Sequence, residues 1–392
     1  MRRILKRTIL SILAVYCFCR RLLFGKTKML FYGFNPMNYT MFRPMHKRIE
    51  ELSHAEVFFS FKTNNNDYSD YIRLGVPENR ILSLKKSRLT IWDSIVLADF
   101  MKPRYLWTNK LIYICHGVAA KKWTYVDAKG KQHVDDYRYN YSLKEYDFVF
   151  FHNEEDYRNA KQRKLFKRED SGQIVGMCCL DEIIRNNNPE KINEIKIKYI
   201  APEYREKKVV LYAPTWDETA SFKRKGEEIL DALSTMDCFL IMKPHPLCIT
   251  SMVGTSGLDL VTFLKEKFPK KNYLLITDTP YEIMPVADMM ISDFSSISFE
   301  FTLLRKPLYL FEGNEIQQKI ADNDQYEMLK KCCFVFKETD SINKNILKYK
   351  ELDHERIEAM RNLQRIYFSN VGHATEIAVQ KLIERKIINS QN

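Results

Sequence analysis

The sequence lacks the signatures of several common classes of protein. Its 12 glycines form neither a Gly-x-Gly-x-x-Gly pattern nor a P-loop, which argues against a standard dinucleotide or ATP site. Its nine cysteines include no Cys-x-x-Cys pair, and Cys178-Cys179 and Cys332-Cys333 lie in apolar runs. This usage indicates reduced core thiols in a cytoplasmic protein, rather than a disulfide framework or a zinc site. Internal repeats and low-complexity tracts are also missing.

The composition that is present favours a large folded protein with an anionic partner. The chain has 392 residues and is 45% hydrophobic, which is enough for two domains of ordinary size. Its formal net charge of +12 fits nucleic acid, a phosphorylated small molecule, an anionic polymer or a membrane surface.

The N-terminal apolar stretch, about residues 8–19, is shorter than the roughly 20 residues of a membrane-spanning helix. Basic residues flank it on both sides: Arg2, Arg3, Lys6, Arg7, Arg20, Arg21, Lys26 and Lys28. We expect residues 1–28 to associate with the membrane as a helix lying on its inner surface, with the cations on anionic lipid. A buried helix is the alternative. A secretory signal peptide would begin similarly, but no clear small-x-small cleavage site follows.

From residue 29 onward, apolar runs of strand length alternate with helical patterns, as is typical of mostly parallel sheets. The expected strands are 29–32, 57–60, 111–115, 147–152 and 173–176, then 209–212, 239–242, 273–276, 289–291 and 308–311. We expect a helix over 95–101, and a long final helix over about 353–386 that is broken near 370–372. The polar stretch 185–207 is the best candidate linker between two domains.

Four polar interruptions follow apolar strands, and ligands of open α/β sheets bind at such strand ends. They are His116-Gly117, Pro214-Thr215-Trp216, Lys243-Pro244-His245-Pro246 and residues 292–296. A histidine can act as a general base or as a phosphate ligand, and a lysine offers a point charge. Serines at a strand-to-helix turn can donate to a phosphate. Each residue also has a structural alternative, such as a serine that only caps a helix.

No pattern in the sequence requires a metal ion or another cofactor. The only Asp-x-Asp is Asp322-Asn323-Asp324, which lies in a polar stretch that we interpret as a solvated loop. No cluster of histidine and cysteine marks a metal site. We therefore expect neither metal nor cofactor.

Taken as an ordered set, these motifs resemble the CDP-glycerol glycerophosphotransferases, which prime or polymerise teichoic acids and similar capsular polymers. The resemblance covers about residues 108–375 and includes Glu300 and Lys306-Pro307. It implies an α/β fold of GT-B type, with two Rossmann-like domains facing a central cleft. We expect an acceptor domain over 29–190, a CDP-donor domain over 205–375, and a helix end and tail over 376–392. Departures from the family pattern are Cys115, Val118, Asp217 and Met177-Cys178.

The resemblance also assigns roles to residues. It implies that His116 is the catalytic base and that His245 acts with it in catalysis. Donor phosphates are expected to bind Lys243, Ser295, Ser296 and Thr215, with Gly117, Asp293 and Glu300 in support.

The function expected from these residues is transfer of glycerol phosphate, or a related polyol phosphate, from CDP-glycerol to a hydroxyl of a lipid-linked saccharide or polymer. CMP would be released. The enzyme would be peripheral, at the cytoplasmic face of the cell membrane, with an anionic membrane surface and no nucleic acid as partner. One alternative is a GT-B glycosyltransferase that uses a CMP- or UDP-sugar in capsule or lipooligosaccharide synthesis. Another is a non-catalytic protein that binds a polymer or nucleic acid.

Overall fold

The computed structural model describes residues 11–389 except 14, 21–22, 24–25, 35, 54, 64–66, 99–106, 116, 119–121, 127–131, 137–142, 218, 246–259, 278, 321–322 and 344–346. The chain divides into two compact units. The first unit comprises Met1–His116, Tyr141–Glu182 and Ile366–Asn392, and the second comprises Gly117–Asn140 and Ile183–Arg365. Both units are therefore assembled from separate stretches of the chain.

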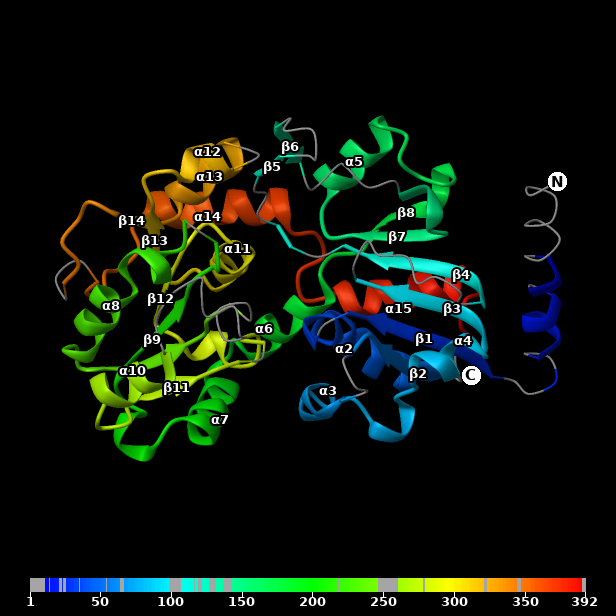
Figure 1. The fold of residues 1–392 in the computed structure, drawn as a ribbon, viewed down its shortest axis with the longest axis horizontal. Coiled ribbons are helices and arrows are strands. Elements are labelled where there is room, and N and C mark those ends of the chain that lie inside the picture. Colours follow the sequence, from blue (N-terminus) through cyan, green and yellow to red (C-terminus); the bar gives the residue numbers. More distant parts are fainter. Residues whose placement is uncertain are drawn as a thin grey trace. The chain divides into compact units, whose positions relative to one another are not determined.

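The first unit is built on a parallel sheet of six strands in the order β2-β1-β3-β4-β7-β8 (Figure 1). The strands are β1 (Thr27–Gly33), β2 (Ala55–Phe61), β3 (Ile91–Leu97), β4 (Trp107–Ile114), β7 (Phe148–Phe151) and β8 (Gly172–Ile174). The helices are α2 (Pro36–Leu52), α3 (Ser69–Arg73), α4 (Leu84–Arg88), α5 (Glu154–Gln162), α6 (Asp181–Asn186, which runs on into the second unit) and α15 (Ala374–Glu384). This order begins as in the flavodoxin-like doubly wound fold.

The second unit has another parallel sheet of six strands, in the order β11-β10-β9-β12-β13-β14. The strands are β9 (Lys208–Ala213), β10 (Cys238–Met242), β11 (Tyr273–Leu275), β12 (Met289–Ser292), β13 (Leu308–Glu312) and β14 (Phe334–Lys337). The helices are α7 (Pro189–Tyr199), α8 (Ser221–Ser234), α10 (Leu260–Lys267), α11 (Ser296–Phe301), α12 (Ile316–Lys319), α13 (Asn323–Lys331) and α14 (His354–Tyr367, which ends in the first unit). In sequence order these strands read 3-2-1-4-5-6, the Rossmann arrangement.

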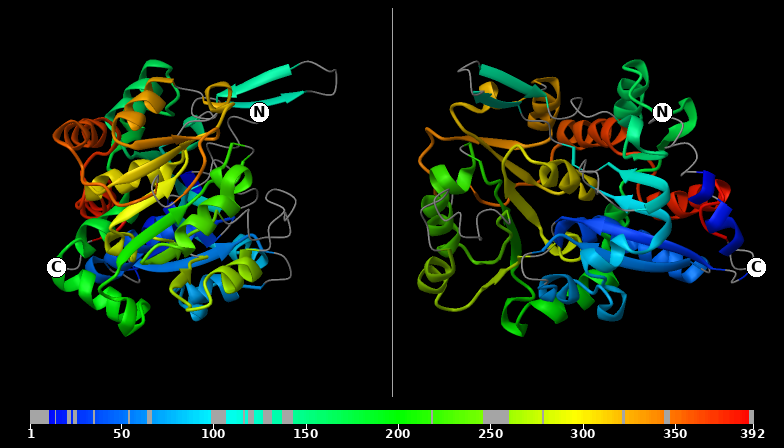
Figure 2. Two further views of the ribbon diagram at one scale, coloured as in Figure 1. Left: turned by 90° about the vertical axis from the view of Figure 1, so that its left-hand side faces the viewer. Right: turned by 45° about the vertical axis from the view of Figure 1, so that its right-hand side comes forward.

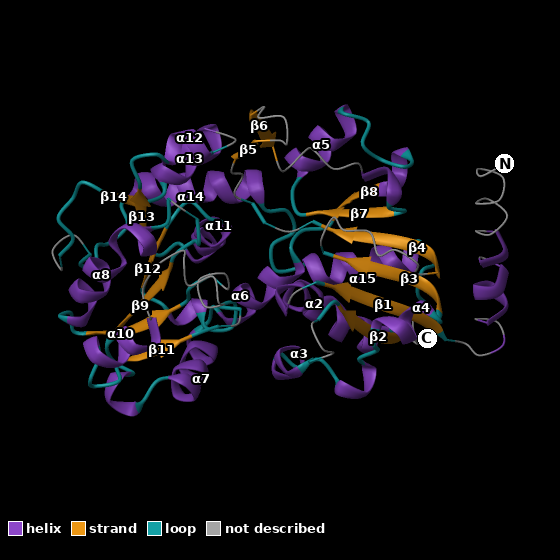
Figure 3. Cartoon of the chain, viewed as in Figure 1, coloured by secondary structure: helices purple, strands orange, loops and turns teal. Residues whose placement is uncertain are grey.

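Most of the strands are buried on both faces, which explains why short continuous apolar runs predict them. In β9, Val209, Val210, Leu211 and Tyr212 are all at most 1% exposed. Successive side chains of a strand point to opposite faces, so both faces of this sheet must be covered. Helices lie on both sides of each sheet (Figure 3), as parallel sheets require. The expectation of two Rossmann-like, mostly parallel α/β domains is confirmed.

Two sequence-based expectations about local structure were wrong. Residues 95–97, expected to begin a helix, belong to the central strand β3, which pairs with β1 and β4. A short apolar run cannot be assigned to helix or strand by periodicity alone, and here burial in the sheet decides. Asn323 and Asp324, expected in a loop, begin helix α13, whose next residues Gln325 and Tyr326 are buried.

The final helix is interrupted where the sequence predicts, since α14 ends at Tyr367 and α15 begins at Ala374. The antiparallel hairpin formed by β5 (Lys122–Val126) and β6 (Gln132–Asp136) was not predicted from the sequence. This hairpin belongs to the second unit, and its two strands project from it (Figure 2).

Candidate functional site

Two of the predicted polar turns meet at the point where the strand order of the second unit reverses. Strand β9 ends at Ala213 and is followed by Thr215, while its neighbour β12 ends at Ser292 and is followed by Asp293. The Ser292 hydroxyl donates to the Ala213 carbonyl at 2.6 Å, which joins the two strand ends. Ligands of open α/β sheets bind at such a switch point, outside the carboxyl ends of the strands.

Asp293 fixes both turns through its carboxylate and its backbone. One carboxylate oxygen accepts the N–H of Thr215 at 2.7 Å, and the other accepts the N–H of Ser221 at 3.0 Å. The Asp293 carbonyl accepts the Ser298 hydroxyl at 2.6 Å. Asp293 is only 2% exposed, and a buried carboxylate is stable when its oxygens accept hydrogen bonds in this way. Its contacts suit the supporting role expected of it.

Ser295 and Ser296 open helix α11, but Ser295 is not a simple cap. Ser295 stands at the N-cap position with extended backbone, and its hydroxyl makes no capping hydrogen bond to any described residue. The hydroxyl lies 3.5 Å from that of Ser292. Both Ser295 and Ser296 are partly exposed.

The Lys-Pro-His motif follows β10, which pairs with β9. Lys243 continues the ladder, since its N–H donates to the Tyr212 carbonyl at 2.8 Å. Its side chain is buried, and its ammonium group donates to the Pro244 carbonyl at 3.0 Å. The ring of His245 lies 6.0 Å from that of Trp216, centroid to centroid. The motifs after β9 and β10 are therefore in contact.

Two ionisable side chains with shifted pKa values lie close to this turn in the sequence, the buried Glu300 and the partly buried Lys306. Glu300, on α11, is 4% exposed, and burial raises its pKa to about 7, against the opposing effect of a hydrogen bond from Tyr281. Burial likewise lowers the pKa of Lys306 to about 8. The Lys306 ammonium group donates to the carbonyls of Pro285 and Ala287 at 2.6 and 2.8 Å. The Lys306 contacts lie before the start of β12 (Met289–Ser292), at the opposite end of that strand from the turn.

The segment after the expected base is held in the same unit. Gly117 has a φ of +79°, a left-handed conformation that glycine adopts without strain. The N–H of Val118 donates to the Ser296 hydroxyl at 2.9 Å, and the Gln325 side chain donates to the Val118 carbonyl at 2.8 Å. The sequence carried no signal for Gln325, because it lies in the polar stretch interpreted as a loop. His116 lies outside the described residues.

One edge of one sheet thus carries Thr215, Asp293, Ser295, Ser296, Lys243 and His245, and Val118 is bonded to side chains of the same unit. Among the residues for which the structure gives positions, no group of three or more histidine, cysteine, aspartate or glutamate side chains could hold a metal ion.

Two Rossmann-like units, each built on a sheet of parallel strands, are typical of GT-B-like proteins, and solved structures share this fold. The wall teichoic acid polymerase TagF matches with a TM-score of 0.64 at 17% identity, over 92% of this chain and 89% of that one. The UDP-GlcNAc 2-epimerase of Neisseria meningitidis matches with a TM-score of 0.52 at 13% identity, over 92% and 100%. At sequence identities this low, the structural similarity shows the fold alone.

The sequence profile described as CDP-Glycerol:Poly(glycerophosphate) glycerophosphotransferase matches residues 16–382, and the chain belongs to this family. The family resemblance is confirmed. A teichoic acid ribitol-phosphate primase of Bacillus spizizenii is 27% identical over 166 residues, 40% of each chain. A teichoic acid poly(glycerol phosphate) polymerase of Bacillus subtilis is 30% identical over 140 residues, 33% of this chain and 17% of the polymerase. The matches therefore span less than half of these relatives.

Proposed function

We propose that this protein transfers glycerol phosphate, or a related polyol phosphate, from CDP-glycerol to a hydroxyl of a lipid-linked saccharide or polymer. The observation that carries the proposal is the polar turn at the switch point of the second unit, where Ser295, Ser296 and Thr215 follow adjacent strand ends. Family membership supports a CDP-activated donor. The relatives named as teichoic acid primases and polymerases support an envelope polymer as acceptor.

The proposed reaction is one displacement at phosphorus. The acceptor oxygen attacks the β-phosphorus of CDP-glycerol, the bond from that phosphorus to the bridging oxygen breaks, and CMP leaves with the electron pair. His116 takes the proton of the acceptor hydroxyl, as the family resemblance implies, and acts as a general base. Ser295, Ser296 and Thr215 would donate to the donor phosphates, and Lys243 and His245 would stabilise the charge that grows on CMP.

A second part of the proposal is that the N-terminal segment holds the enzyme at the cytoplasmic face of the membrane. Residues 11–13 and 15–20 are helical. One side of this helix is attached to the first unit: Leu13 and Cys17 are buried, and Arg20 pairs with buried Asp93 and donates to the Ile91 carbonyl. Large apolar side chains on the helix are nevertheless exposed, namely Ile12, Val15, Tyr16 and Phe18.

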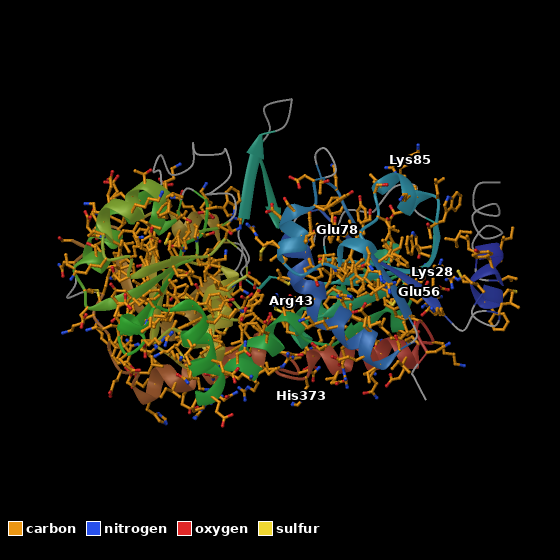
Figure 4. All side chains as sticks on the ribbon, turned by 90° about the horizontal axis from the view of Figure 1, so that it is seen from below. Lys28, Arg43, Glu56, Glu78, Lys85 and His373 are labelled. Atoms are coloured by element: carbon orange, nitrogen blue, oxygen red, sulfur yellow. The ribbon has the colours of Figure 1, made fainter. Side chains whose placement is uncertain are left out.

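An exposed apolar face suits a lipid surface, and the many basic residues of this segment of the sequence favour an anionic one. Lys26 and Lys28 follow the helix, and Lys28 and Glu56 are register partners in β1 and β2 that lie close together on the side of the unit nearest the helix (Figure 4). None of the helices that the structure describes is long and apolar enough to cross a membrane.

The transferase proposal is tested by measuring nucleotide release. The purified protein is incubated with membrane extract and CDP-glycerol, and in parallel with other CDP-polyols, CMP-sialic acid and UDP-GlcNAc. We expect CMP release from CDP-glycerol, and its loss in the double variant Ser295→Ala, Ser296→Ala. Turnover of the nucleotide sugars alone would make the protein a glycosyltransferase. Salt-sensitive binding to polyanions without nucleotide release would make it a binding protein.

The membrane proposal is tested by co-sedimentation with vesicles of phosphatidylglycerol. The double variant Val15→Asp, Phe18→Asp should bind these vesicles less than the wild type does, because both side chains are exposed on the helix. Ile197→Asp, at a 52% exposed apolar position of α7, is the matched control and should bind like the wild type. Equal binding by all three proteins would contradict the proposal.

A further inference from the structure

The peptide segment directly after His116 is bonded to the second unit by two side chains that are distant in the sequence. The chain leaves β4 at Ile114 and reaches Gly117, the first residue counted with the second unit. The N–H of Val118 donates to the Ser296 hydroxyl at 2.9 Å, and the Gln325 side chain donates to the Val118 carbonyl at 2.8 Å. We call this pair of hydrogen bonds the Val118 clasp.

Burial makes the Val118 clasp specific. Val118 is 4% exposed and Gln325 is 1% exposed. Buried backbone groups need partners, and both polar groups of Val118 receive them from side chains of two different helices, α11 and α13. Gly117 is held against the same hydroxyl, since a Cβ added there would lie 3.4 Å from the Ser296 oxygen. Removing either side chain would leave a buried backbone group of Val118 without that partner.

The Val118 clasp shares an atom with the proposed phosphate site. A serine hydroxyl has one proton to donate and two lone pairs that accept. Ser296 accepts from Val118, and this hydrogen bond uses a lone pair of the hydroxyl and not its proton. One hydroxyl can therefore serve both the donor and the segment that carries the base.

We propose that Gln325 and Ser296 are positioning residues for the transfer reaction: through Val118 they fix the peptide that follows His116. Consecutive Cα atoms lie about 3.8 Å apart, so the fixed segment Gly117-Val118 begins one residue after the proposed base. In this proposal Gln325 acts through Val118, whereas Ser296 would also bind the donor. This inference rests on the proposed function, in which His116 is the base.

The substitution Gln325→Met separates positioning from binding. Methionine keeps the length and the apolar packing of the side chain but cannot donate to the Val118 carbonyl. A misplacement of about 1 Å can cost about 100-fold in rate, so we expect kcat to fall about 10- to 100-fold. The Kd for CDP-glycerol should stay within about twofold of the wild-type value, since Gln325 holds no phosphate in this proposal. Ser296→Ala should raise the Kd and lower kcat.

The matched control is Gln364→Met. Gln364 also belongs to the second unit, and its side-chain amide also donates to a backbone carbonyl, that of Thr302. If loss of a glutamine-to-carbonyl bond acts only by loosening the fold, both variants should change turnover alike. We expect the control to keep wild-type kcat.

Hydrogen exchange tests the Val118 clasp without substrate. The peptide that contains Val118 should take up deuterium faster in Gln325→Met and in Ser296→Ala, and at the wild-type rate in the control. If Gln325→Met does not fold, Gln325→Glu replaces it. A neutral carboxyl can donate to the Val118 carbonyl and a carboxylate cannot, so the ratio of variant to wild-type turnover should rise as the pH is lowered.

Two results would overturn the inference: unchanged exchange at Val118, or wild-type kcat in a folded Gln325 variant whose Val118 exchanges faster. Failure of the proposed function would show differently, as a wild-type protein that releases no CMP from CDP-glycerol. The exchange measurement would then still decide whether the Val118 clasp exists, and the positioning role would be rejected.

Discussion

Replacing Glu300 with glutamine should stabilise the protein, and the gain should grow as the pH rises. Glu300 is 4% exposed on α11, and burial raises its pKa from 4.5 to about 7 while a hydrogen bond from Tyr281 opposes the rise. Between these two pH values the native protein keeps a proton that the unfolded chain has released. Glutamine keeps the shape and the acceptor for Tyr281, and it has no charge to bury.

The magnitude follows from the linkage between protonation and folding. One pKa unit is worth about 1.4 kcal/mol, so a rise of this size destabilises the ionised native state by about 3 kcal/mol. The stability associated with this carboxyl is complete below about pH 4.5 and is lost as the pH rises through about 7. From about pH 5.5 to about pH 8, the wild type should lose about 2 kcal/mol that the Glu300→Gln variant keeps.

Urea unfolding of both proteins across this pH range measures the difference. Glu312→Gln is a control of opposite sign. Hydrogen bonds from Lys330 and Tyr326 outweigh burial and lower the pKa of Glu312. That variant should be less stable than the wild type near neutral pH, and the gap should narrow in acid. A Glu300→Gln gain that does not change with pH, or a loss at about pH 8, would show that the native carboxylate is ionised and paired, and would refute the reasoning.

Three further predictions concern the proposed site. His116→Ala should lower CMP release about 100-fold or more with little effect on CDP-glycerol affinity measured by calorimetry, whereas His245→Ala should weaken both release and affinity. Substitution of the exposed His354 on α14 serves as the control. Full activity of His116→Ala would exclude His116 as the base. Asp293→Asn places an amide against one of two backbone N–H groups, and should reduce the free energy of unfolding by about 1–3 kcal/mol and weaken donor binding. Lys306→Met loses two carbonyl contacts and should be less stable than the wild type, with a gap that widens above about pH 8 because the native pKa is lowered.

Most strands of both sheets could be predicted from the sequence because they are buried on both faces. Residues 239–242 are a continuous apolar run, and in β10 all four are at most 2% exposed. Such a run can be recognised without knowing which other strands pair with it, and turn-forming residues mark where it ends. The positions of Thr215, His245 and Ser295 at strand ends followed directly, since each comes just after such a run.

Strand β3 was not predicted because its buried polar residues pair with residues that are distant in the sequence. Asp93 and Ser94 interrupt the apolar pattern, yet both are at most 1% exposed. The Asp93 carboxylate pairs with Arg20 and accepts the N–H of Lys28 at 2.6 Å. A buried charge is tolerated when it is paired and hydrogen-bonded, and no local pattern around residue 93 shows that its partners lie more than 60 positions earlier.

The division of the chain into units could not be predicted from local sequence patterns, for a similar reason. The sequence suggested continuous domains, whereas residues 366–392 belong to the first unit. Asp181 accounts for part of this arrangement, because its two carboxylate oxygens accept the N–H groups of Ala374 and Thr375 at 3.2 and 2.7 Å. These N–H groups stand at the start of α15, where helix donors have no partner within the helix. The capping residue comes from 193 positions earlier.

The same principle limits what motifs reveal about the site itself. A motif identifies side chains whose spacing along the chain is short, such as Ser295 and Ser296, and it assigns both to one ligand. The structure gives the two hydroxyls different neighbours, because Ser296 accepts the N–H of Val118 while the Ser295 hydroxyl lies beside Ser292. Gln325 is connected to the proposed site through a backbone carbonyl, which any residue at position 118 would have. A contact that depends on backbone geometry leaves no pattern in the side chains, so the residues that position a catalytic segment are those for which a structure adds most to a sequence.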